Sequence, residues 1–469
     1  MTRPPQKILI ATFGSLGDLH PFVALAHALK CEGLAPVIVT SAGYRDFVEG
    51  EGIAFAPARP DVGDLTARLG LDMAGIARAM AKDDRFLFES LIFPHLRESY
   101  EDALAQCDGA AALVAHSLCF AAKIAAEKRG LPLVNVLLSP VLLYSAHDPP
   151  LGTYVPFAST PRSALALAYN RLLLGALTRA IGVWAAPVRR LRREAGLPKA
   201  RGLELFAGAP KPAATIGLFS PLLAPPRPDH PDGTLIAGHS FHDRYSPEGG
   251  AADGDALAPD LAAFLDGGPA PIVFTLGSFV ARDRPAHYRA CAEAARKLGR
   301  RAVLLAHDGD LEALGGVAGP DVFVSGYAPH SLVFPRACLI AHHGGIGTTG
   351  QALRAGRPQL TTPFLGDQYD NGDRLRRLGV ARTLRRQAAT PERLARELEA
   401  LLSTPAYAAR AEALGREAAR EDGAAAAAQR IAALVRGRPA TPASRAPGAG
   451  GPSSRPADSG SLAFRERPQ

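Results

Sequence analysis

AHHGGIGTTGQALRAGRPQLTTPFLGDQYDN, residues 341–371, is the segment that decides the fold class of this chain. An apolar run ends at two histidines, a glycine-rich turn follows, and TTGQALRAG has the spacing of a helix that ends at a glycine. PQLTTPF is a second short apolar run, which again ends in a polar loop. Because continuously apolar strands alternate with a helix, the segment is typical of a parallel sheet with helices on both faces.

The same alternation runs through most of the chain. It begins with the strand KILIATFG (Lys7–Gly14), is interrupted by the proline-rich stretch Pro221–Gly233, and restarts at APIVFTLGS, residues 270–278. We therefore predict an α/β protein with two Rossmann-like, doubly wound domains that face a central cleft. The predicted parts are an N-terminal domain (1–225), a linker region (226–260), a C-terminal domain (261–402), closing C-terminal helices (403–436) and a disordered tail (437–469).

Composition excludes several classes of protein. The net charge is +8, but the tail from Arg436 carries six arginines against Asp458 and Glu466, a net +4, so the remaining chain is only mildly basic. No cluster of Lys and Arg with interleaved aromatic residues indicates a nucleic-acid partner. Five scattered cysteines without a CxxC pair, and an N-terminus without the apolar core of a signal peptide, predict a reduced, cytoplasmic protein.

The most apolar long stretch, Ser163–Val188, contains Arg171 and Arg179. A membrane-spanning helix of roughly 20 residues would bury at least one of these arginines. We therefore predict a helix of a soluble protein. Peripheral contact with the inner face of a membrane is the alternative for this stretch.

The loop inside the opening segment suits an anionic ligand. Gly344, Gly345 and Gly347 let the backbone turn sharply and approach a ligand closely. Gly347 and Thr348 open the predicted helix, whose free N–H groups and positive dipole end attract an anion. We expect His342 to add a hydrogen bond to a phosphate oxygen. For this loop alone, an ordinary strand-to-helix turn with a threonine cap is the alternative.

Three further motifs follow strands of the same predicted sheet. TLGS ends the first strand of the domain with Gly277 and Ser278. GYAP supplies an aromatic ring, Tyr327, that can stack on a base. Asp367 and Gln368 can exchange hydrogen bonds with neighbouring sugar hydroxyls. Because the carboxyl ends of parallel strands share one edge of a sheet, we predict a site for base, diphosphate and sugar at that edge.

In this order the motifs resemble the nucleotide-sugar signature of the GT-B glycosyltransferases of family 1. In that family the aromatic residue stacks on the base, the histidine and the small residues after it contact the diphosphate, and the Asp-Gln pair holds the sugar. The residues that the resemblance assigns to the donor are Gly277, Ser278, Tyr327, Ala328, His342, Gly344, Gly345, Gly347, Thr348, Asp367 and Gln368. Gly350 departs from the pattern, because plant members carry a ribose-binding glutamate there. This departure would suit a deoxyribose nucleotide such as dTDP.

TFGSLGDLHPF, residues 12–22, follows the first strand. It lacks the GxGxxG spacing of a dinucleotide-binding loop, and no acidic residue ends the second strand. Bacterial members of the family have their acceptor-side general base at the position of Asp18, whose structural alternative is a helix N-cap. The other residues that we place on the acceptor side are Gly17, His20, His116 and Ser117. His20 is the weaker candidate base and fits a structural role better. His116 and Ser117 either line the acceptor pocket or belong to the core.

A finer resemblance is to the catalytic B subunits of the rhamnosyltransferases that make rhamnolipids. It covers most of residues 1–436 and includes SAHDPP, Ser145–Pro150. It implies dTDP-L-rhamnose as the donor and a hydroxylated fatty-acid ester as the acceptor. We therefore expect an inverting hexosyltransferase in which residues 1–225 bind the acceptor and residues 261–402 bind the nucleotide-sugar.

We expect neither a cofactor nor a metal ion, because DGD, residues 308–310, fits a loop and helix cap. The expected partners are the donor and a hydrophobic, hydroxylated acceptor, with peripheral membrane contact and a complex with an acceptor-supplying enzyme as further partners. Three alternatives stay open. The acceptor is a sterol, a polyketide or another small hydrophobic molecule; the chain is a non-catalytic nucleotide-sugar-binding partner; or it is a nucleotide-sugar epimerase.

Overall fold

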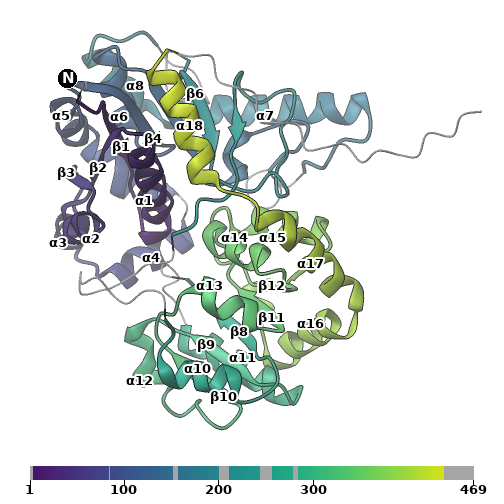
Figure 1. Cartoon of the computed structure of the whole chain (residues 1–469). Coiled ribbons are helices and arrows are strands. Elements are labelled where there is room, and N and C mark those ends of the chain that lie inside the picture. The colour runs from purple at the N-terminus through teal and green to yellow at the C-terminus, as the bar shows by residue number, and fades with distance from the viewer. Residues whose placement is uncertain are drawn as a thin grey trace, which may run out of the picture.

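We describe the protein from a computed structural model. The residues that the structure describes are 4–83, 85–150, 157–199, 211–242, 256–277 and 284–437. They form two parallel sheets, each with helices on both faces, one above the other in Figure 1. The predicted α/β class with two doubly wound domains is therefore confirmed.

The first sheet has seven strands in the order β3-β2-β1-β4-β5-β6-β7, all parallel. The strands are β1 (Lys7–Ala11), β2 (Ala35–Thr40), β3 (Ala54–Pro57), β4 (Ala110–His116), β5 (Leu133–Leu137), β6 (Ala214–Gly217) and β7 (Leu235–Ile236). The order reverses between β1 and β4, so the carboxyl ends of these two strands meet at a switch point, where ligands of such sheets bind.

Both faces of the first sheet are buried. The helices of this part are α1 (Leu16–Cys31), α2 (Arg45–Gly50), α3 (Val62–Leu69), α4 (Met73–Lys82), α5 (Leu96–Gln106), α6 (Phe120–Lys128), α7 (Ala164–Trp184) and α8 (Ala186–Glu194). Along β1, Ile8 and Ile10 pack against α1, whereas Leu9 points to the face covered by α5, α6 and α8. This two-sided burial explains why the strands read as continuous apolar runs.

The second sheet has six parallel strands in the order β10-β9-β8-β11-β12-β13. The strands are β8 (Ile272–Thr275), β9 (Ala302–Leu305), β10 (Val322–Ser325), β11 (Leu339–His342), β12 (Gln359–Thr361) and β13 (Ala381–Thr383). The helices around it are α10 (Pro259–Asp266), α11 (Arg284–Lys297), α12 (Leu311–Leu314), α13 (His330–Val333), α14 (Ile346–Arg354), α15 (Gln368–Arg377), α16 (Pro391–Ser403) and α17 (Pro405–Ala418). Its switch point lies between β8 and β11.

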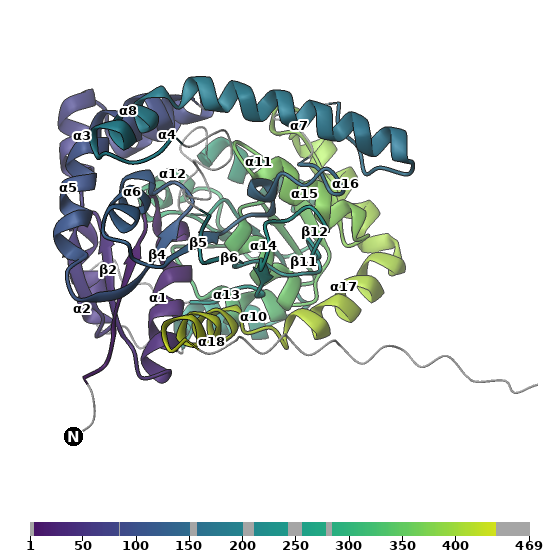
Figure 2. The same ribbon diagram turned by 90° about the horizontal axis from the view of Figure 1, so that it is seen from above.

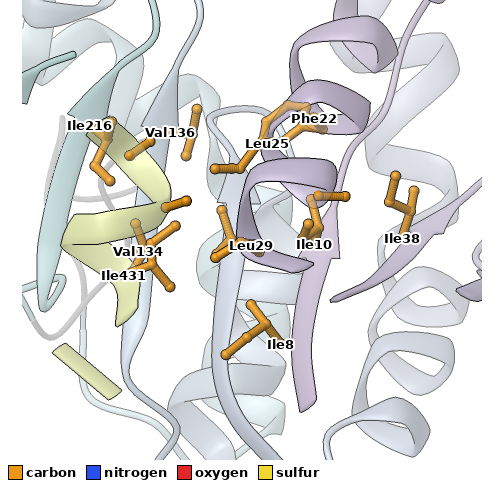
Figure 3. Close-up of a cluster of buried hydrophobic side chains, with 14 of the residues drawn as sticks. Ile8, Ile10, Phe22, Leu25, Leu29, Ile38, Val134, Val136, Ile216 and Ile431 are labelled. Atoms are coloured by element: carbon orange, nitrogen blue, oxygen red, sulfur yellow. The ribbon is translucent and has the colours of Figure 1, made fainter. Parts of the chain in front are cut away.

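The last helix, α18 (Gly423–Val435), returns to the first sheet. Figure 3 shows Ile431 of this helix beside Val134 and Ile216, on the same face as Leu29 of α1. The preceding helix, α17, packs on the second domain, where it belongs to the cluster that covers α14 and α15. The helices predicted to close the C-terminal domain are therefore divided between the two domains.

One further predicted boundary differs from the structure. Strand β7 lies inside residues 226–260, so the first sheet extends into the segment predicted to be a linker. Sequence analysis did not predict β7, because this strand has only two residues and follows a proline-rich stretch. The tail predicted to be disordered lies outside the described residues from position 438 onward.

The apolar stretch Ser163–Val188 forms two helices in place of one. α7 ends at Trp184, and α8 starts at Ala186 with Pro187 in its first turn, where the missing N–H of proline is tolerated. The two helix axes are bent by 59°. Among the described residues, no helix alone has the length and apolar composition to cross a membrane, although this bent pair passes both criteria when taken together.

Candidate active site

Asp18 lies in the first turn of α1, at the switch point of the first sheet. Its Oδ2 accepts hydrogen bonds from the Ser15 backbone N–H (2.8 Å) and from Ser15 Oγ (3.1 Å). Gly14 has a φ of +133°, and a side chain there would overlap the carboxylate of Asp18. Gly17 belongs to the same turn of the helix. The N-cap is therefore Ser15 and not Asp18, whose carboxylate instead completes a capping box from the third position of the helix and is held in one orientation.

The second oxygen of Asp18 faces His116, the last residue of β4. His116 Nε2 lies 4.0 Å from Asp18 Oδ1. His116 Nδ1 accepts a hydrogen bond from the Leu118 N–H at 3.4 Å, so the ring proton lies on Nε2, toward the carboxylate. Burial, with a smaller contribution from Lys123, lowers the pKa of His116 to about 3. A neutral imidazole thus stands beside the candidate base.

The environment of Asp18 suits a general base. Burial raises its pKa to about 6, the hydrogen bonds from Ser15 oppose this shift, and the charge of Asp367 adds to it. The side chain keeps 35% of its surface exposed, so it remains accessible to a reactant. A base whose pKa lies near the operating pH combines a deprotonated state with a useful proton affinity.

Two other predicted acceptor-side residues, His20 and Ser117, contact other residues of the chain. The ring of His20 packs against Phe47 and His242, with centroids 5.6 and 5.4 Å away, and burial lowers its pKa to about 3. Ser117 is completely buried, and its carbonyl accepts a hydrogen bond from Lys123 Nζ at 2.8 Å. Of the two roles expected for Ser117, complete burial fits the core role, and contact with an acceptor stays a prediction.

A mostly apolar cavity of about 60 Å³ lies at the same edge of the first sheet. Phe13, Ile92, Leu96 and Phe120 line it, and Arg59 is one of its few polar neighbours. Thr12, which also lines the cavity, donates a hydrogen bond from Oγ1 to the Asp18 carbonyl at 3.2 Å. The cavity therefore lies beside the first turn of α1, which carries the candidate base.

His342 ends β11 and is almost completely buried. Its Nε2 lies 3.0 Å from Gln359 Oε1, and its Nδ1 accepts a hydrogen bond from the Gly344 N–H at 3.1 Å. Burial lowers its pKa to about 4, although the bond to Gln359 acts in the opposite direction. In this structure Nδ1 of His342 holds the glycine loop and Nε2 is engaged by Gln359 of β12, so both ring nitrogens have partners, and the expected hydrogen bond from His342 to a phosphate stays a prediction.

The neighbouring His343 lies between the two glycine turns of the second sheet. A side chain at Gly277 or at Gly345 would overlap its ring. Its Nδ1 is buried and has no hydrogen-bond partner among the described residues. Burial, with smaller contributions from His342 and His330, lowers its pKa to about 3. A buried polar atom without a partner calls for an explanation, and a bound ligand provides one.

Helix α14 begins directly after this histidine. Its N-cap is Gly345, and no side chain caps it. A side chain at Gly347 would meet no described atom within 4 Å. Thr348 and Thr349 are buried behind it, and Thr349 Oγ1 has no partner in the described part of the chain. The first-turn N–H groups and the helix dipole thus remain available to an anion.

Gly350, the position of the missing ribose-binding glutamate, lies against His239 of the segment after β7. A side chain at Gly350 would meet the His239 ring at 2.6 Å. His239 Nε2 is buried without a partner within the described ranges, and burial lowers the pKa of this histidine to about 4. The space beside α14 is therefore filled by a ring that comes from the connection between the domains, which sequence analysis did not identify.

Asp367 and Gln368 stand at the start of α15, beside the glycine loop. Asn371 donates to Asp367 Oδ2 (2.9 Å) and to the Gly344 carbonyl (3.0 Å). Gln368 Oε1 accepts from the N–H groups of Phe364 (2.8 Å) and Leu365 (3.2 Å), which leaves its amide NH₂ for a ligand. Burial raises the pKa of Asp367. Sequence analysis missed Asn371, although its place one helical turn after Asp367 was a usable signal.

The remaining predicted donor residues are divided. Tyr327 follows β10 with 42% of its surface exposed, so its ring is accessible for stacking, and Ala328 beside it is buried. Ser278 lies outside the described residues.

Asp310 of the DGD motif precedes α12 and forms an ion pair with Arg284 at 2.8 Å. Within the described ranges no three His, Cys, Asp or Glu side chains gather as metal ligands, and independence from metal stays a prediction.

The two domains are joined behind α15 by a buried ion network. Arg374 pairs with Asp148 of the first domain and with Asp370 of its own helix, and all three side chains are at most 4% exposed. Arg377 binds the other oxygen of Asp148 at 3.0 Å. Burial alone would raise the pKa of Asp148, but the two arginines outweigh it and lower the pKa. SAHDPP thus contributes a contact between domains, a role that its sequence does not indicate.

Family models match both halves of the chain. Residues 8–146, which include Asp18 and His116, match the model described as Glycosyltransferase family 28 N-terminal domain. Residues 295–434, which include the glycine loop and α15, match the model described as Erythromycin biosynthesis protein CIII-like, C-terminal domain. The descriptions of these two models differ from the family 1 signature from which we argued.

Solved glycosyltransferases share the arrangement of both domains. The calicheamicin glycosyltransferase CalG4 matches with a TM-score of 0.67 at 18% identity, over 92% of this chain and 99% of that chain. The glycosyltransferase VinC in complex with dTDP matches with a TM-score of 0.64 at 19% identity, over 92% of this chain and 100% of that chain. This chain has the GT-B fold.

Curated relatives of this GT-B chain are longer proteins. The sterol 3-beta-glucosyltransferase of Emericella nidulans is 30% identical over 441 residues, which are 91% of this chain and 30% of the relative. The sterol 3-beta-glucosyltransferase of Aspergillus terreus is 29% identical over 450 residues, which are 92% of this chain and 30% of the relative. The GT-B chain therefore spans 30% of the length of these two relatives.

Proposed function

We propose that the chain is an inverting glycosyltransferase that moves a sugar from a nucleoside diphosphate to a hydroxyl of a small hydrophobic acceptor. The second domain holds the donor, with the diphosphate at the uncapped start of α14 and the sugar at Asp367 and Gln368. The first domain holds the acceptor, with its apolar part in the cavity beside Phe13. The homologous relatives and both family models support this class of activity.

In the proposed step, Asp18 takes the proton of the acceptor hydroxyl as its oxygen attacks the anomeric carbon. The bond between that carbon and the diphosphate oxygen breaks, and the electron pair leaves on the diphosphate. Donors that are already in place, namely the N–H groups of α14 and the unpartnered His343, stabilise the developing charge. Attack opposite to the leaving group inverts the anomeric carbon.

One observation carries the proposal. Ser139, which follows β5 of the first sheet, donates to Asn371 Oδ1 at 3.4 Å, and Asn371 in turn donates to Asp367 of the second domain at 2.9 Å. The candidate sugar subsite therefore lies against the same edge of the first sheet at which α1 carries Asp18. A binding partner without catalytic activity would not need a carboxylate with a raised pKa at this point.

The identity of the substrates is the finer part of the proposal. Two relatives are named sterol 3-beta-glucosyltransferases, and similar structures include spinosyn rhamnosyltransferase SpnG with a spinosyn aglycone. They favour a sterol-like or polyketide-like acceptor over the hydroxylated fatty-acid ester expected from the rhamnolipid resemblance. Complexes of VinC and SpnG with thymidine diphosphate support dTDP as the nucleotide, and L-rhamnose stays the proposed sugar.

The test is a turnover assay on the purified chain with dTDP- and UDP-linked glucose and rhamnose, each offered with a sterol, a polyketide aglycone and a hydroxyalkanoyl ester. Release of free nucleoside diphosphate that depends on the acceptor supports the proposal. Release or conversion of the donor without an acceptor would indicate an epimerase or hydrolase. Tight binding of dTDP with no turnover for any pair would indicate a binding partner and overturn the assignment.

A further inference from the structure

Helix α7 presents an apolar strip on the surface of the molecule. Among the described residues, six large hydrophobic side chains are exposed, and five of them are on this helix or just before it. They are Phe157 (75% exposed), Leu165 (81%), Tyr169 (47%), Leu172 (72%) and Val183 (72%). Positions 165, 169, 172 and 183 lie on one face of a helix, so the strip is continuous. Soluble monomers rarely expose a large apolar strip without a binding role.

The opposite face of α7 is anchored, so the strip has a fixed orientation. Asn170 is buried and donates to the carbonyls of Ala146 (3.0 Å) and Ser159 (2.9 Å). Leu174 packs with Ala146 in a buried cluster. The helix is therefore apolar on both sides, a pattern typical of helices that are covered all round. The described residues cover only one side of α7, the long outer helix in Figure 2.

The charged residues of the segment that carries the strip all have one sign. Residues 157–193 contain seven arginines and no Asp or Glu. Arg192 is buried in an ion pair with Glu127, and Arg190 pairs with Glu194 just beyond the segment. Arg162, Arg171 and Arg179 are exposed beside the apolar residues. The exposed Glu89 accepts a hydrogen bond from Trp184 at the end of the strip, whereas the charges along the strip itself are arginines. Such a strip complements a surface that is apolar below and negatively charged above.

We propose that α7 docks this protein on an anionic lipid bilayer, with its apolar strip at the level of the acyl chains and its arginines on the lipid phosphates. The helix has 21 residues and is therefore about 30 Å long, which suits a helix that lies along the surface. The lipid phosphates supply the negative charge that the segment lacks. This docking is independent of the proposed function.

The position of α7 adds a consequence for the cavity in the first domain. Trp184, at the end of α7, packs against Phe88 and Phe93, with ring centroids 4.4 and 5.2 Å away. Ile92, the neighbour of Phe93, lines the cavity beside Asp18. A bilayer that contacts α7 therefore lies near the cavity, which allows an apolar acceptor to enter from lipid.

The test is flotation of the full chain with vesicles of phosphatidylcholine alone and of phosphatidylcholine mixed with phosphatidylglycerol. We expect binding to the mixed vesicles. Leu172→Glu with Val183→Glu should abolish it, and both sites are exposed, so folding should be retained. Arg171→Gln with Arg179→Gln should weaken binding roughly twentyfold, since each arginine near an anionic surface contributes about fivefold. Circular dichroism confirms that each variant is folded.

A matched control replaces two exposed arginines on the far domain. Arg396 and Arg416 lie on α16 and α17 with 69% and 68% of their side chains exposed, and Arg396→Gln with Arg416→Gln should leave vesicle binding unchanged. Equal losses in this control and in the α7 arginine variant would show a non-specific charge effect and overturn the proposal. So would a wild-type chain that does not float. A dimer in solution that Leu172→Glu converts to a monomer would assign the strip to a second copy instead.

Discussion

Helices α1 and α14 both begin at the switch point of their sheet, yet they use their N-termini in opposite ways. The start of α1 is occupied by the chain's own carboxylate, since Asp18 Oδ2 accepts from Ser15 N–H and Ser15 Oγ. The start of α14 follows Gly345 and has no side-chain cap. Figure 1 shows the two helices in different domains.

The difference shows how one architecture supplies two kinds of site. A helix start that is filled by its own carboxylate no longer attracts an external anion, but it fixes that carboxylate in place. A helix dipole lowers the pKa of a carboxylate at its start, yet burial raises the pKa of Asp18 to about 6. At α14 the open N–H groups remain for a ligand. The same fold thus provides a proton acceptor in one domain and an anion cradle in the other.

The largest expected effect tests the filled helix start. Asp18→Asn keeps the shape and one acceptor oxygen but cannot take a proton. Turnover in the acceptor-dependent assay should fall by about 100-fold to 10,000-fold. Affinity for dTDP, measured by calorimetry, should be unchanged because the nucleotide binds at α14. Near-normal turnover would remove Asp18 from the role of base.

The comparison also depends on the buried contact that joins the two domains. Arg374→Met leaves Asp148 and Asp370 buried without their shared partner, and breaking a buried ion pair in this way lowers the free energy of unfolding by about 3–5 kcal/mol. Denaturant unfolding measures this change.

Arg376→Met on the same helix is the matched control for Arg374→Met. Arg376 is 58% exposed and pairs only with Asp373, so its loss should change the free energy of unfolding by less than about 1 kcal/mol. Equal losses for the two variants would contradict a structural role for the buried network.

The raised pKa of Asp18 predicts a pH dependence. The base is deprotonated above pH 6, so kcat/KM should be constant there and fall about tenfold per pH unit below it. The effect on stability is opposite to that of an acidic residue whose pKa is lowered on folding. Above pH 6 the ionised carboxylate of Asp18 lowers the free energy of unfolding, and this loss fades as the pH falls from 6 toward 3.8. Asp18→Asn should therefore gain stability relative to wild type at pH 7.5, and the gain should shrink at pH 4.5. A pH profile without a limb near 6 would contradict this environment.

A smaller effect tests the open helix start. Gly347→Ala adds a methyl group where no described atom lies within 4 Å, so the fold should gain up to about 1 kcal/mol from helix propensity. If the diphosphate binds there, the same methyl should weaken dTDP binding about tenfold, which is ~1.4 kcal/mol. Gly175→Ala in α7 is the control, because it adds the same group to a helix far from the donor. Unchanged dTDP affinity in Gly347→Ala would place the diphosphate elsewhere.

Sequence analysis reached the architecture and the main elements of the site. The strands β1 and β11 and the glycine loop lie where the pattern predicts, because strand burial and turn chemistry act over a few residues. The Asp-Gln pair, expected in a loop, opens helix α15 instead. It assigned the phosphate contact to His342, whereas the structure engages this ring with Gln359 and leaves His343 between the glycine turns. Two adjacent histidines cannot be told apart by spacing, since their environments depend on partners from other strands.

Local sequence thus determined on its own the two parallel sheets, the place of Asp18 in the first turn of a helix and the bare backbone before α14. Apolar periodicity and the special conformations of glycine are properties of short segments, so they can be read without the rest of the chain. Tertiary structure alone decided that α18 covers the first sheet, that His239 fills the space beside Gly350, and that Arg374 joins the domains. The pKa of Asp18 belongs to the same group, because burial and the charge of Asp367 arise only when distant parts of the chain come together.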